Sequence, residues 1–489
     1  MRTVAVLGGG IGGLAAAHYL SRSAPAAKVV LLEQSGRFGG WLWSSRRSDG
    51  AVFELGPRGV RPVGPVGRNT LNLVEELGLE HEVLPVTYSH VASQSRFLFV
   101  RGQLWKMPAG LSGLLKTTPP FSRPLLPQLL KEVFVPKGKE DDESLHSFVS
   151  RRFSAELADI AVDSLCRGVF AGDCRRLSVG ACFPDLLRAE RRRGSVLLGM
   201  LLGSGAKPEV APGPLAQRAQ REHWAQWSLR RGLESLPEAL VQSLEQNIGV
   251  ELHAQAPVKG LEPTDSGWRI RSEAGMISAD HIVSALPATA LSQLLPPSCQ
   301  PLVSLLQQLP YVTVAVVSLE YSGCVLPVQG FGHLLPSSED PGVLGVVYDS
   351  EFFPQHNSPD KESTRLTVMM GGAWFQEVFG DPDRVKPDHL LSTAVSAVSR
   401  HLGVSQNPVW SNVALHRDCI PQYHQGHTRR VELMRGFISD TKLPLSLVGS
   451  SYDGVSVNDV IFSGRTAVDM LLAAMDLKPV TSVLEFTNS

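Results

Sequence analysis

The 489-residue sequence lacks any run of the roughly 18 to 20 apolar residues that a membrane-spanning helix needs, so no segment is expected to cross a bilayer. It also lacks an excess of either charge, because 46 Lys and Arg oppose 47 Asp and Glu. The net charge of -1 argues against nucleic acid as the main partner, since phosphate binding requires a basic face. Repeats and low-complexity tracts are missing as well, and the length predicts two or three globular domains.

Cysteine is scarce, with six residues, no CxxC pair and no histidine spacing typical of zinc. The sequence therefore predicts neither a disulfide framework nor a metal site. Cys166, Cys174 and Cys182 recur every eight residues, which is neither a helical nor a strand period, and we interpret them as buried thiols. No cluster of His, Cys or Glu identifies a dedicated general base, so protons released in a reaction are expected to go to solvent.

The charge is uneven along the chain. Residues 96–210 contain 18 Lys and Arg against 12 Asp and Glu, a local balance of +6. Within this stretch, Arg191, Arg192 and Arg193 directly precede the apolar run 196–202, and residues 203–214 are predicted to form a loop. Two interpretations remain open, a solvated basic face and a surface that lies on anionic lipid.

The first residues have the pattern of a βαβ unit. A buried strand over Thr3–Leu7 is followed by a glycine turn, a helix over Leu14–Ser23 and a second strand over Val29–Glu33. Such crossovers are right-handed, so both strand ends and the helix N-terminus are expected at one edge of a parallel sheet. That edge is the predicted ligand site.

The glycine turn has the spacing GxGxxG, formed by Gly8, Gly10 and Gly13. Glycine here permits a tight turn and a close approach of a pyrophosphate to the helix N-terminus. Glu33 lies twenty residues after Gly13, at the end of the second strand, where a carboxylate can accept hydrogen bonds from ribose hydroxyls. A turn used only for helix packing would not require both features, so we predict a bound dinucleotide.

A second glycine pair, Gly39-Gly40, follows Arg37 and precedes Trp41, and it lets another loop pass close to the cofactor. This favours FAD over NAD. No later strand is followed by a complete GxGxxG, because Gly330-Phe331-Gly332 lacks the third glycine. We therefore expect the electrons to leave for a small acceptor such as dioxygen rather than for a nicotinamide.

Later segments predict a mixed sheet and a return to α/β structure. The expected strands are 268–270, 281–285, 312–319, 344–347, 366–370 and 445–448. A turn over 449–454 then leads to a long helix over 457–475, whose positive end would face a bound anion such as reduced flavin. We interpret Asn458 and Asp459 as ordinary helix-start residues. Helices are also expected over 144–153 and 154–169.

The segment Gly8 to Trp41, together with Glu54-Leu55-Gly56-Pro57-Arg58-Gly59, resembles the flavin amine oxidase superfamily. Three further segments, 163–172 (DSLCRGVFAG), 336–340 (PSSED) and 454–459 (GVSVND), are similar to its protoporphyrinogen oxidase family in the animal mitochondrial form. The resemblance covers almost the whole chain. It implies oxygen-dependent, six-electron oxidation of protoporphyrinogen IX to protoporphyrin IX with release of hydrogen peroxide, the penultimate step of haem synthesis.

The resemblance implies an α/β fold in which a discontinuous Rossmann-like FAD-binding domain accompanies a mixed-sheet substrate domain and an inserted helical membrane-binding domain. The expected segments are 1–90, 228–292 and 425–489 for FAD, 209–227 and 293–424 for substrate, and 91–208 for the helical insertion. The implied FAD contacts are Gly8, Gly9, Gly10, Ile11, Gly12, Gly13, Glu33, Gln34, Trp41, Gly56, Pro57, Arg58, Gly59, Val258, Ser450, Val455, Ser456 and Val457. The turn 449–454 contains no cysteine, so FAD is expected to be noncovalent.

For the substrate, the resemblance implies an apolar clamp formed by Phe331, Leu334 and Met369. A porphyrinogen is broad and apolar but carries two propionates, so its site also needs a fixed cation. Arg96 matches the family's carboxylate partner, and Arg58 is the expected catalytic residue where the loop meets the flavin. Arg167 is interpreted either as a substrate neighbour or as a structural ion-pair partner.

The resemblance also implies a homodimer that lies peripherally on the inner mitochondrial membrane, on the intermembrane-space side, with ferrochelatase as a further partner. The predicted first strand begins next to Met1, so no cleaved presequence is expected, as in the family's animal members. Two alternatives remain open. In the first, the chain is an amine oxidase or a polyene desaturase. In the second, it is a flavin-free binding protein of the Rab GDP-dissociation-inhibitor type.

Overall fold

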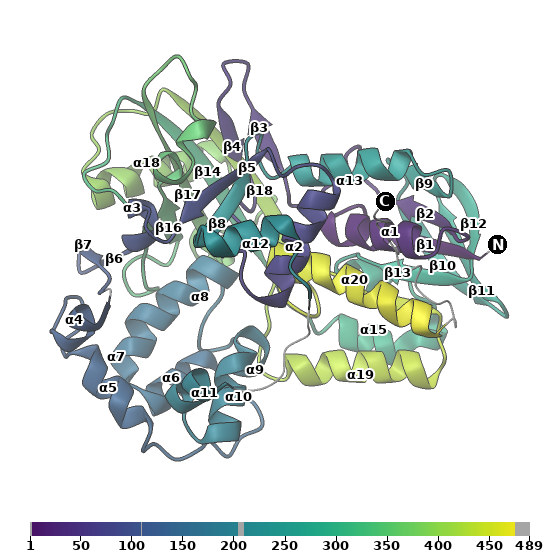
Figure 1. Cartoon of the computed structure of the whole chain (residues 1–489), viewed down its shortest axis with the longest axis horizontal. Helices are drawn as coiled ribbons and strands as arrows, with labels where there is room; N and C mark the ends of the chain where they lie inside the picture. Colours follow the sequence, from purple (N-terminus) through teal and green to yellow (C-terminus); the bar gives the residue numbers. More distant parts are fainter. Residues whose placement is uncertain (1, 109, 204–209, 475–489) are drawn as a thin grey trace, which may run out of the picture.

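The computed structural model describes residues 2–108, 110–203 and 210–474. Figure 1 shows a parallel sheet with its helices at the right, a larger sheet at the upper left, and a group of helices below the larger sheet. The predicted α/β class is confirmed. The residue limits of the six predicted segments remain a prediction.

The parallel sheet has five strands in the order β19-β13-β1-β2-β9, and every neighbouring pair is parallel. Its strands come from widely separated parts of the chain. They are β1 (Thr3–Leu7), β2 (Lys28–Leu32), β9 (Val250–His253), β13 (His281–Ser284) and β19 (Leu445–Leu447). The βαβ unit predicted from the first residues is confirmed.

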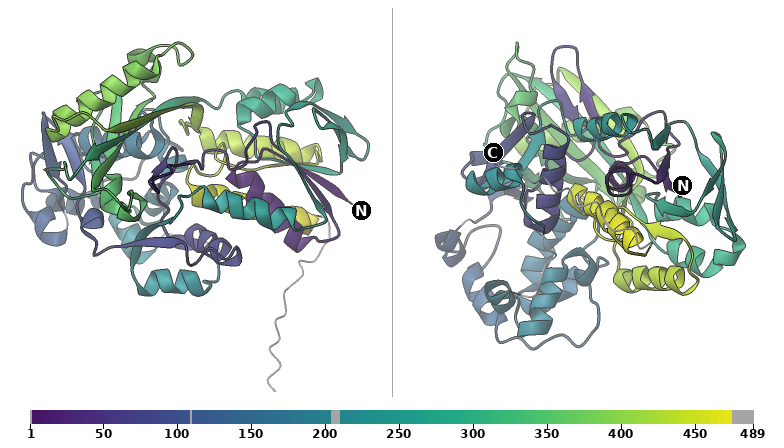
Figure 2. Two further views of the ribbon diagram at one scale, coloured as in Figure 1. Left: turned by 90° about the horizontal axis from the view of Figure 1, so that it is seen from above. Right: turned by 45° about the vertical axis from the view of Figure 1, so that its right-hand side comes forward.

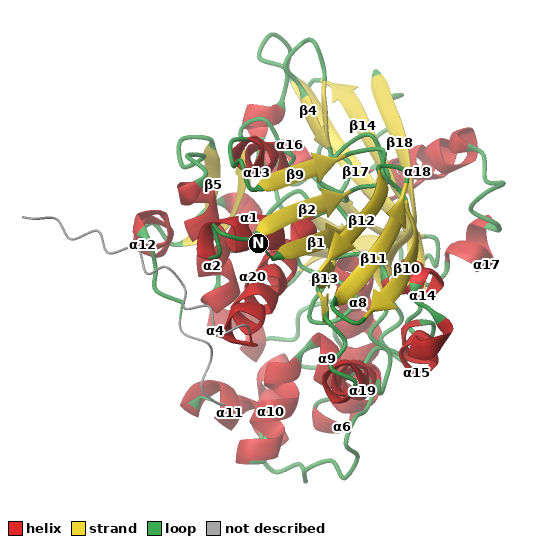
Figure 3. Cartoon of the chain, turned by 90° about the vertical axis from the view of Figure 1, so that its right-hand side faces the viewer, coloured by secondary structure: helices red, strands yellow, loops and turns green. Residues whose placement is uncertain are grey.

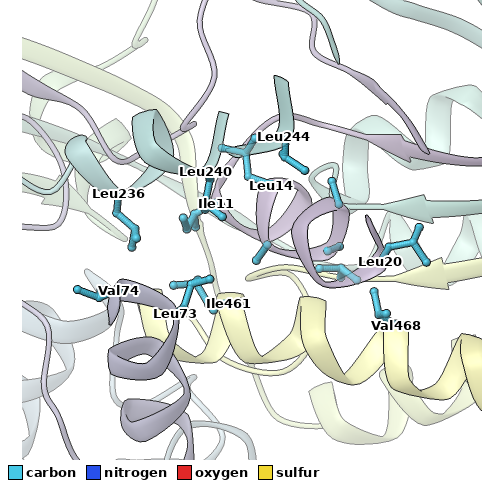
Figure 4. Close-up of a cluster of buried hydrophobic side chains, with 14 of the residues drawn as sticks. Ile11, Leu14, Leu20, Leu73, Val74, Leu236, Leu240, Leu244, Ile461 and Val468 are labelled. Carbon is cyan, nitrogen blue, oxygen red and sulfur yellow. The ribbon is translucent and has the colours of Figure 1, made fainter. Parts of the chain in front are cut away.

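One face of this sheet is covered by helices, as Figure 4 shows for Leu14 and Leu20 of α1, Leu240 of α13 and Ile461 and Val468 of α20. The helices on this face are α1 (Ile11–Ser23), α2 (Gly64–Glu76), α12 (Pro214–Arg221), α13 (Ser235–Glu245) and α20 (Val457–Ala474). Helix α1 begins at Ile11, three residues earlier than predicted. Its glycines are poor helix formers, but they allow close packing that outweighs the propensity.

The opposite face packs against a three-stranded sheet and three helices, with Ala5, Leu7, Val30 and Ile282 in the interface. Figure 3 shows this small sheet beside β1 and β13. Its elements are β10 (Val258–Thr264), β11 (Gly267–Ser272), β12 (Gly275–Ala279), α14 (Ala288–Leu294), α15 (Gln300–Leu306) and α19 (His427–Asp440). A 3₁₀ turn, Pro297–Cys299, links α14 to α15.

The larger sheet has seven strands in the order β18-β14-β17-β16-β15-β6-β7. The strands are β6 (Phe97–Val100), β7 (Gln103–Lys106), β14 (Tyr311–Ser322), β15 (Gly332–Leu334), β16 (Val343–Val347), β17 (Ser363–Gly372) and β18 (Trp410–Pro421). Helix α18 (Pro387–Leu402) covers one face, against residues such as Val317, Leu366 and Val368. The predicted mixed sheet is confirmed, because β15 and β6 pair in parallel while every other neighbouring pair in this sheet is antiparallel.

A group of helices lies below both sheets in the right-hand view of Figure 2. It comprises α4 (Gly110–Leu115), α5 (Leu125–Glu132), α6 (Leu145–Arg152), α7 (Ala155–Leu157), a π-helix (Ala158–Val162), α8 (Asp163–Phe170), α9 (Val179–Cys182), α10 (Pro184–Arg193) and α11 (Val196–Leu202). The helix predicted over 144–153 is α6, which Ser144 caps by accepting the N–H of Ser147 at 3.1 Å. The helix predicted over 154–169 includes the π-helix in its middle.

Shorter elements connect these parts. They are β3 (Ser44–Arg46), β4 (Val52–Glu54), β5 (Val83–Thr87), α3 (Val91–Gln94), β8 (Trp224–Leu229), α16 (Asp349–Phe352), a 3₁₀ turn (Pro354–His356) and α17 (Phe375–Phe379). Within the described ranges no helix is long and apolar enough to cross a membrane. All six cysteines are free thiols. Much of the loop predicted over 203–214, and the end of the helix predicted to reach Met475, lie outside the described residues.

Candidate active site

The glycine turn between β1 and α1 is built from close backbone contacts. Gly8 adopts φ +96°, and its N–H donates to Leu32 O at 2.8 Å. A Cβ at Gly13 would lie 1.9 Å from Gly8 O, so only glycine lets the helix pack on the end of the strand. At Gly9 a Cβ would lie 2.5 Å from Phe38 Cδ1.

Gly10 differs from these positions, because a Cβ there would meet no protein atom closer than Gly40 Cα at 3.9 Å. Its backbone, at φ -70° and ψ 175°, suits any residue, so the protein itself does not require glycine. The open space lies at the N-terminus of α1, beside Ile11 and Gly12, where free N–H groups favour a pyrophosphate. This arrangement fits the predicted dinucleotide.

Glu33 stands at the end of β2, beside the turn. Its Oε2 accepts the N–H of Gly9 at 2.7 Å, and its Oε1 accepts that of Ser35 at 2.8 Å. The carboxylate is half-buried, whereas Gln34 beside it is exposed. Val258 begins β10 close to this point, since Ala256 N donates to Glu33 O at 2.8 Å. The predicted ribose and adenine residues thus lie together at the edge of the sheet.

The second glycine pair lies directly against the first turn. Gly39 N donates to Gly9 O at 2.8 Å, and a Cβ at Gly40 would lie 3.1 Å from Gly10 Cα. Arg37 holds this loop, because its guanidinium donates to Phe38 O at 2.8 Å and to Gly40 O at 2.6 Å. Arg37 was noticed in the sequence without a role, and we interpret it as the residue that fixes the loop.

Two further loops complete the cradle. In the loop Gly56-Pro57-Arg58-Gly59, a Cβ at Gly56 would lie 2.0 Å from Trp41 O, so the loop runs directly along the tryptophan. In the other loop, Ser450 and Val455 precede α20, and Val457 is the first residue of that helix. FAD would be held between these loops and the glycine turn.

The first turn of α20 shows what the side chains of Ser456, Asn458 and Asp459 do. Ser456 Oγ donates to Asp459 Oδ2 at 2.6 Å and accepts the N–H of Asp459 at 3.2 Å, which is a helix cap. Asn458 Nδ2 donates to Arg61 O at 2.8 Å. The helix-start role predicted for Asp459 is confirmed. That prediction is wrong for Asn458, whose side chain joins α20 to the loop that follows Arg58.

Arg58 reaches from this loop to the larger sheet. Its Nη1 donates to Asp349 Oδ1 at 2.8 Å, and Asp349 Oδ2 accepts the hydroxyl of Thr367 at 2.7 Å. Arg58 Nη2 is buried, and no acceptor contacts it in the described parts of the chain. Burial raises the pKa of the neighbouring Glu54 to about 7, although the Arg58 charge opposes this shift. Because Nη2 is closed off from solvent in the ligand-free chain, a ligand reaches this donor only if neighbouring side chains move.

The sheet brings Leu334 and Met369 into one row. Leu334 pairs with Gly345, and Gly345 pairs with Met369, so the two side chains flank a position without a side chain. Gly168 of α8 packs behind Leu334, since a Cβ there would lie 2.7 Å from Leu334 Cδ2. Thr367 lies two residues before Met369 on the same face of β17. Arg58 is therefore coupled to the strand that carries part of the predicted clamp.

Phe331 lies just before β15 and packs edge-on against Phe352 at 4.4 Å, apart from the row of Leu334 and Met369. Arg96 is exposed, and its guanidinium lies 5.8 Å from the Phe331 ring centre. Burial of its stem and the positive charge of Arg61 lower the pKa of Arg96. No carboxylate of the described chain pairs with either guanidinium, which fits the predicted role of Arg96 toward a carboxylate ligand.

The ion pair predicted for Arg167 as one alternative is not formed within the described structure, and the other alternative, a substrate neighbour, remains a prediction. Arg167 is buried, and it donates from Nη2 to Asp340 O and Val343 O, each at 2.6 Å. Its guanidinium also lies over Trp374 at 4.4 Å, and burial lowers its pKa to about 10. The sequence could not reveal this role, because the acceptors are backbone carbonyls about 175 residues away.

Asp163, Asp173 and Cys174 place potential metal ligands within 4.8 Å of one another. The contacts of this group are structural. Asp163 Oδ2 accepts the N–H of Ser337 at 2.6 Å, and the thiol of Cys174 lies 3.5 Å from Oδ1. Burial raises the pKa of Cys174, so in this structure the thiol is protonated and donates toward Asp163.

His416 was missed in the sequence because no motif surrounds it. Its ring packs edge-on against Trp41 at 5.3 Å, and its Nε2 lies 2.5 Å from Leu55 O. Burial lowers its pKa, so the ring is neutral near pH 7. The residue lines a cleft of about 410 Å³ together with Trp43, Leu55 and Ala414. His416 thus contacts both loops that are predicted to touch the flavin.

Comparison with known proteins agrees with this geometry. The chain matches the family described as "Flavin containing amine oxidoreductase" over residues 11–472. A protoporphyrinogen oxidase of Bos taurus is 50% identical over 472 residues, covering 96% of this chain and 98% of that protein. A protoporphyrinogen oxidase of Homo sapiens is 50% identical over 473 residues with the same coverage. A solved structure from Exiguobacterium sp. 255-15 shares the fold, with a TM-score of 0.77 at 24% identity, covering 97% of this chain and 99% of its own.

The predicted cofactor and enzyme class are therefore confirmed. The family match begins at Ile11, at the end of the glycine turn, and includes both later loops and most of α20. The relatives are matched along almost their whole length, so the resemblance is not confined to the cofactor site. The chain belongs to the flavin containing amine oxidoreductase family and, within it, to the protoporphyrinogen oxidases, and it is an FAD-dependent oxidase.

Proposed function

We propose that the chain oxidises protoporphyrinogen IX to protoporphyrin IX. In this reaction the substrate loses six hydrogen atoms, and three dioxygen molecules are reduced to three hydrogen peroxide molecules. The observation that carries the proposal is the pair of relatives at 50% identity along nearly the whole chain. The link from Arg58 to the strand of Met369 also supports it, because it joins the cofactor loop to an apolar sheet face.

FAD supplies the acceptor for a hydride from a ring carbon of the substrate, and it binds without a covalent bond to the chain. The chain's own residues orient the substrate. Leu334 and Met369 offer an apolar surface to the macrocycle, and Arg96 offers an unpaired cation to a propionate. Arg58 is held by Asp349, which fixes its guanidinium beside the loop Gly56–Gly59 that is predicted to contact FAD.

An anaerobic titration tests this function. The FAD-loaded protein is mixed with protoporphyrinogen IX in the absence of oxygen, and the flavin absorbance is followed. We expect the flavin bands to bleach, and to return with porphyrin fluorescence above an enzyme-free control when oxygen is admitted. A yellow protein that the porphyrinogen does not bleach would contradict the proposed substrate, and bleaching by an amine would support the amine oxidase alternative.

Arg58→Ala is expected to lower kcat/KM by about 100-fold, because one preorganised donor at a reacting site contributes about that much. Steady-state porphyrin fluorescence measures this effect. Arg47→Ala is the matched control, since Arg47 pairs with Glu320 of the larger sheet at 2.5 Å and also joins the first residues to that sheet. An equal loss of kcat/KM in both variants would show that Arg58 acts only by holding the first residues of the chain against the larger sheet.

We also propose that the chain lies peripherally on the inner mitochondrial membrane, on the intermembrane-space side. Helices α5 and α11 support this, because they expose Phe134 just after α5 and Met200, Leu201 and Leu202 on α11, with Phe134 86% and Leu201 80% exposed. The exposed Arg192 lies on the preceding helix α10. Apolar side chains beside basic ones are typical of a surface that binds anionic lipid.

Met200→Glu is expected to weaken binding to anionic phospholipid vesicles by about tenfold, because burial of one methionine contributes about 1.5 kcal/mol or more. Met276→Glu is the control. Met276 is similarly exposed, at 60% against 68%, but lies on β12 in the small sheet. Vesicle sedimentation measures both variants. Equal binding by the two variants would favour the solvated basic face.

We further propose a homodimer and delivery of the product to ferrochelatase, on the basis of the family resemblance alone. Light scattering of the purified protein tests the first proposal, where a monomer mass would contradict it. Sedimentation with purified ferrochelatase tests the second.

A further inference from the structure

The turn Gly449–Gly454 between β19 and α20 carries Ser450, a predicted FAD contact, and sets the position of the first turn of α20. Both of its end glycines adopt positive φ, +106° for Gly449 and +145° for Gly454. Within the turn, Tyr452 N donates to Gly449 O at 3.3 Å. Gly449 N donates outside it, to Ser463 Oγ at 3.0 Å. The far end of the turn therefore depends on contacts from elsewhere in the chain.

Tyr423 supplies such a contact. Its hydroxyl donates to Ser450 O and accepts the N–H of Gly454 at 2.8 Å, so one oxygen bridges the two halves of the turn. The side chain is 2% exposed, and burial raises the pKa of the phenol well above its usual range. The single hydroxyl proton is donated to Ser450 O, and a lone pair of the hydroxyl oxygen accepts the N–H of Gly454. Phenylalanine would keep the shape of the ring and lose both bonds.

Tyr423 is held in place from two further sides. Its ring stacks on that of His427 in α19, with centres 3.9 Å apart and an interplanar angle of 15°. Its carbonyl accepts the N–H of Ser178, the residue that caps α9, at 2.8 Å. His427 itself lies 3.1 Å from Tyr452 O through Nε2. The hydroxyl is thus fixed by the helical part of the chain and by α19 before any cofactor binds.

We infer that Tyr423 is a positioning residue for FAD, which acts by fixing the distance between Ser450 and Gly454 and so the placement of the N–H groups of Val455 and Val457. The tyrosine works through the turn. The N–H groups at the start of α20 stabilise negative charge, so their placement matters more for the reduced, anionic cofactor than for the oxidised one.

Tyr423→Phe tests this inference. We expect oxidised FAD to bind about tenfold more weakly to the apoprotein, as measured by quenching of FAD fluorescence. We also expect the reduced form to lose about a further tenfold, which lowers the reduction potential of bound FAD by about 30 mV. The potential is measured at saturating FAD, so a variant that is only less stable would not change it.

Tyr452→Phe is the matched control, because the Tyr452 hydroxyl is buried in the same turn with no hydrogen-bond partner in the described structure. It is expected to change the affinity for FAD by no more than about twofold and the reduction potential by no more than about 10 mV. His427→Phe should lower thermal stability but keep the potential, since the Tyr423 bridge remains. The inference is overturned if Tyr423→Phe matches Tyr452→Phe in both affinity and potential.

A second substitution covers the case in which Tyr423→Phe does not fold. With 3-fluorotyrosine at position 423 both hydrogen bonds remain, but the donor is stronger and the acceptor weaker. The bridge is therefore altered without being lost, and a smaller shift of the potential is expected. An unchanged potential in this protein would contradict the inference.

Discussion

Gly10→Val is expected to weaken FAD binding on the order of a thousandfold and to leave the apoprotein folded. A Cβ at Gly10 would meet no protein atom within 3.9 Å, and the backbone there is not strained. The added side chain would instead fill the space that a pyrophosphate needs at the start of α1. We expect the affinity for FAD to fall on the order of a thousandfold, about 4 kcal/mol.

Titration of the apoprotein with FAD measures this loss, and circular dichroism checks the fold. Gly436→Val is the control, because a Cβ at Gly436 in α19 also has open space around it and Gly436 is not among the predicted FAD contacts. It should bind FAD normally. Gly13→Ala is expected to behave differently from both, since its Cβ would lie 1.9 Å from Gly8 O and the packing of α1 on β1 would fail. A Gly10→Val protein that retains stoichiometric FAD would show that the pyrophosphate does not approach this glycine.

The features that could be predicted from the sequence are those whose functional residues lie close together in the chain. The turn from Gly8 to Gly13 and the carboxylate of Glu33 lie within one βαβ unit, so their meeting follows from local geometry. The long helix after Gly454 was visible from its apolar pattern. In each case, the residues that define the feature lie within a few tens of positions of one another.

The parts that could not be predicted depend on pairing between distant strands and loops. Arg58 and Asp349 are 291 residues apart, and nothing in either segment indicates that they meet. Tyr423 is closer to its turn, at 27 and 31 residues from its partners, but its contacts follow from the way α19 and β19 pack. Arg167 shows the same limit, because the sequence gives its charge but not its burial or its carbonyl acceptors.

These distant contacts share a physical feature. Arg58, Arg167 and Tyr423 each place a buried donor across a boundary between parts of the chain that have their own hydrophobic clusters. A buried donor that loses its acceptor costs more than an exposed one, so such contacts define how the parts fit together. The geometry of the proposed site therefore depends on how these parts fit together.

The buried pair of Glu132 and Arg152 in the helical part is expected to give the largest loss of stability when it is broken. Both side chains have zero exposed fraction, and Arg152 Nε donates to Glu132 Oε1 at 2.7 Å. Glu132 also accepts Ser195 Oγ at 2.5 Å and the N–H of Val196 at 2.8 Å, which fixes the start of α11. Burial alone would raise the pKa of Glu132, but the hydrogen bonds from Ser195, Val196 and Arg152 lower it.

Glu132→Gln removes the nearer counterion of Arg152 and leaves Glu190 Oε1 at 3.3 Å from Arg152 Nη1, so the loss is expected to be about 3 kcal/mol, the low end for a broken buried pair. Hydrogen exchange of peptides from α6 and α11 measures this loss of stability, which is seen as a fall in the free energy of local opening. The double variant Glu132→Gln, Arg152→Met removes both charges, and the amide oxygen of the substituted side chain can still accept the N–H of Val196. It should therefore recover about 1 to 3 kcal/mol of that loss.

A fall of less than about 1 kcal/mol in Glu132→Gln would show that Glu190 and the carbonyls of Val135 and Gly194, which also contact Arg152, satisfy the guanidinium without Glu132. Loss of the Glu132–Arg152 pair is also expected to affect the proposed lipid surface. Helix α11 carries Met200 and Leu201 on the side that faces away from the chain, and its start is held by Glu132. Loss of vesicle binding in Glu132→Gln, with recovery in the double variant, would indicate that the buried pair stabilises the helix in the orientation that exposes these side chains.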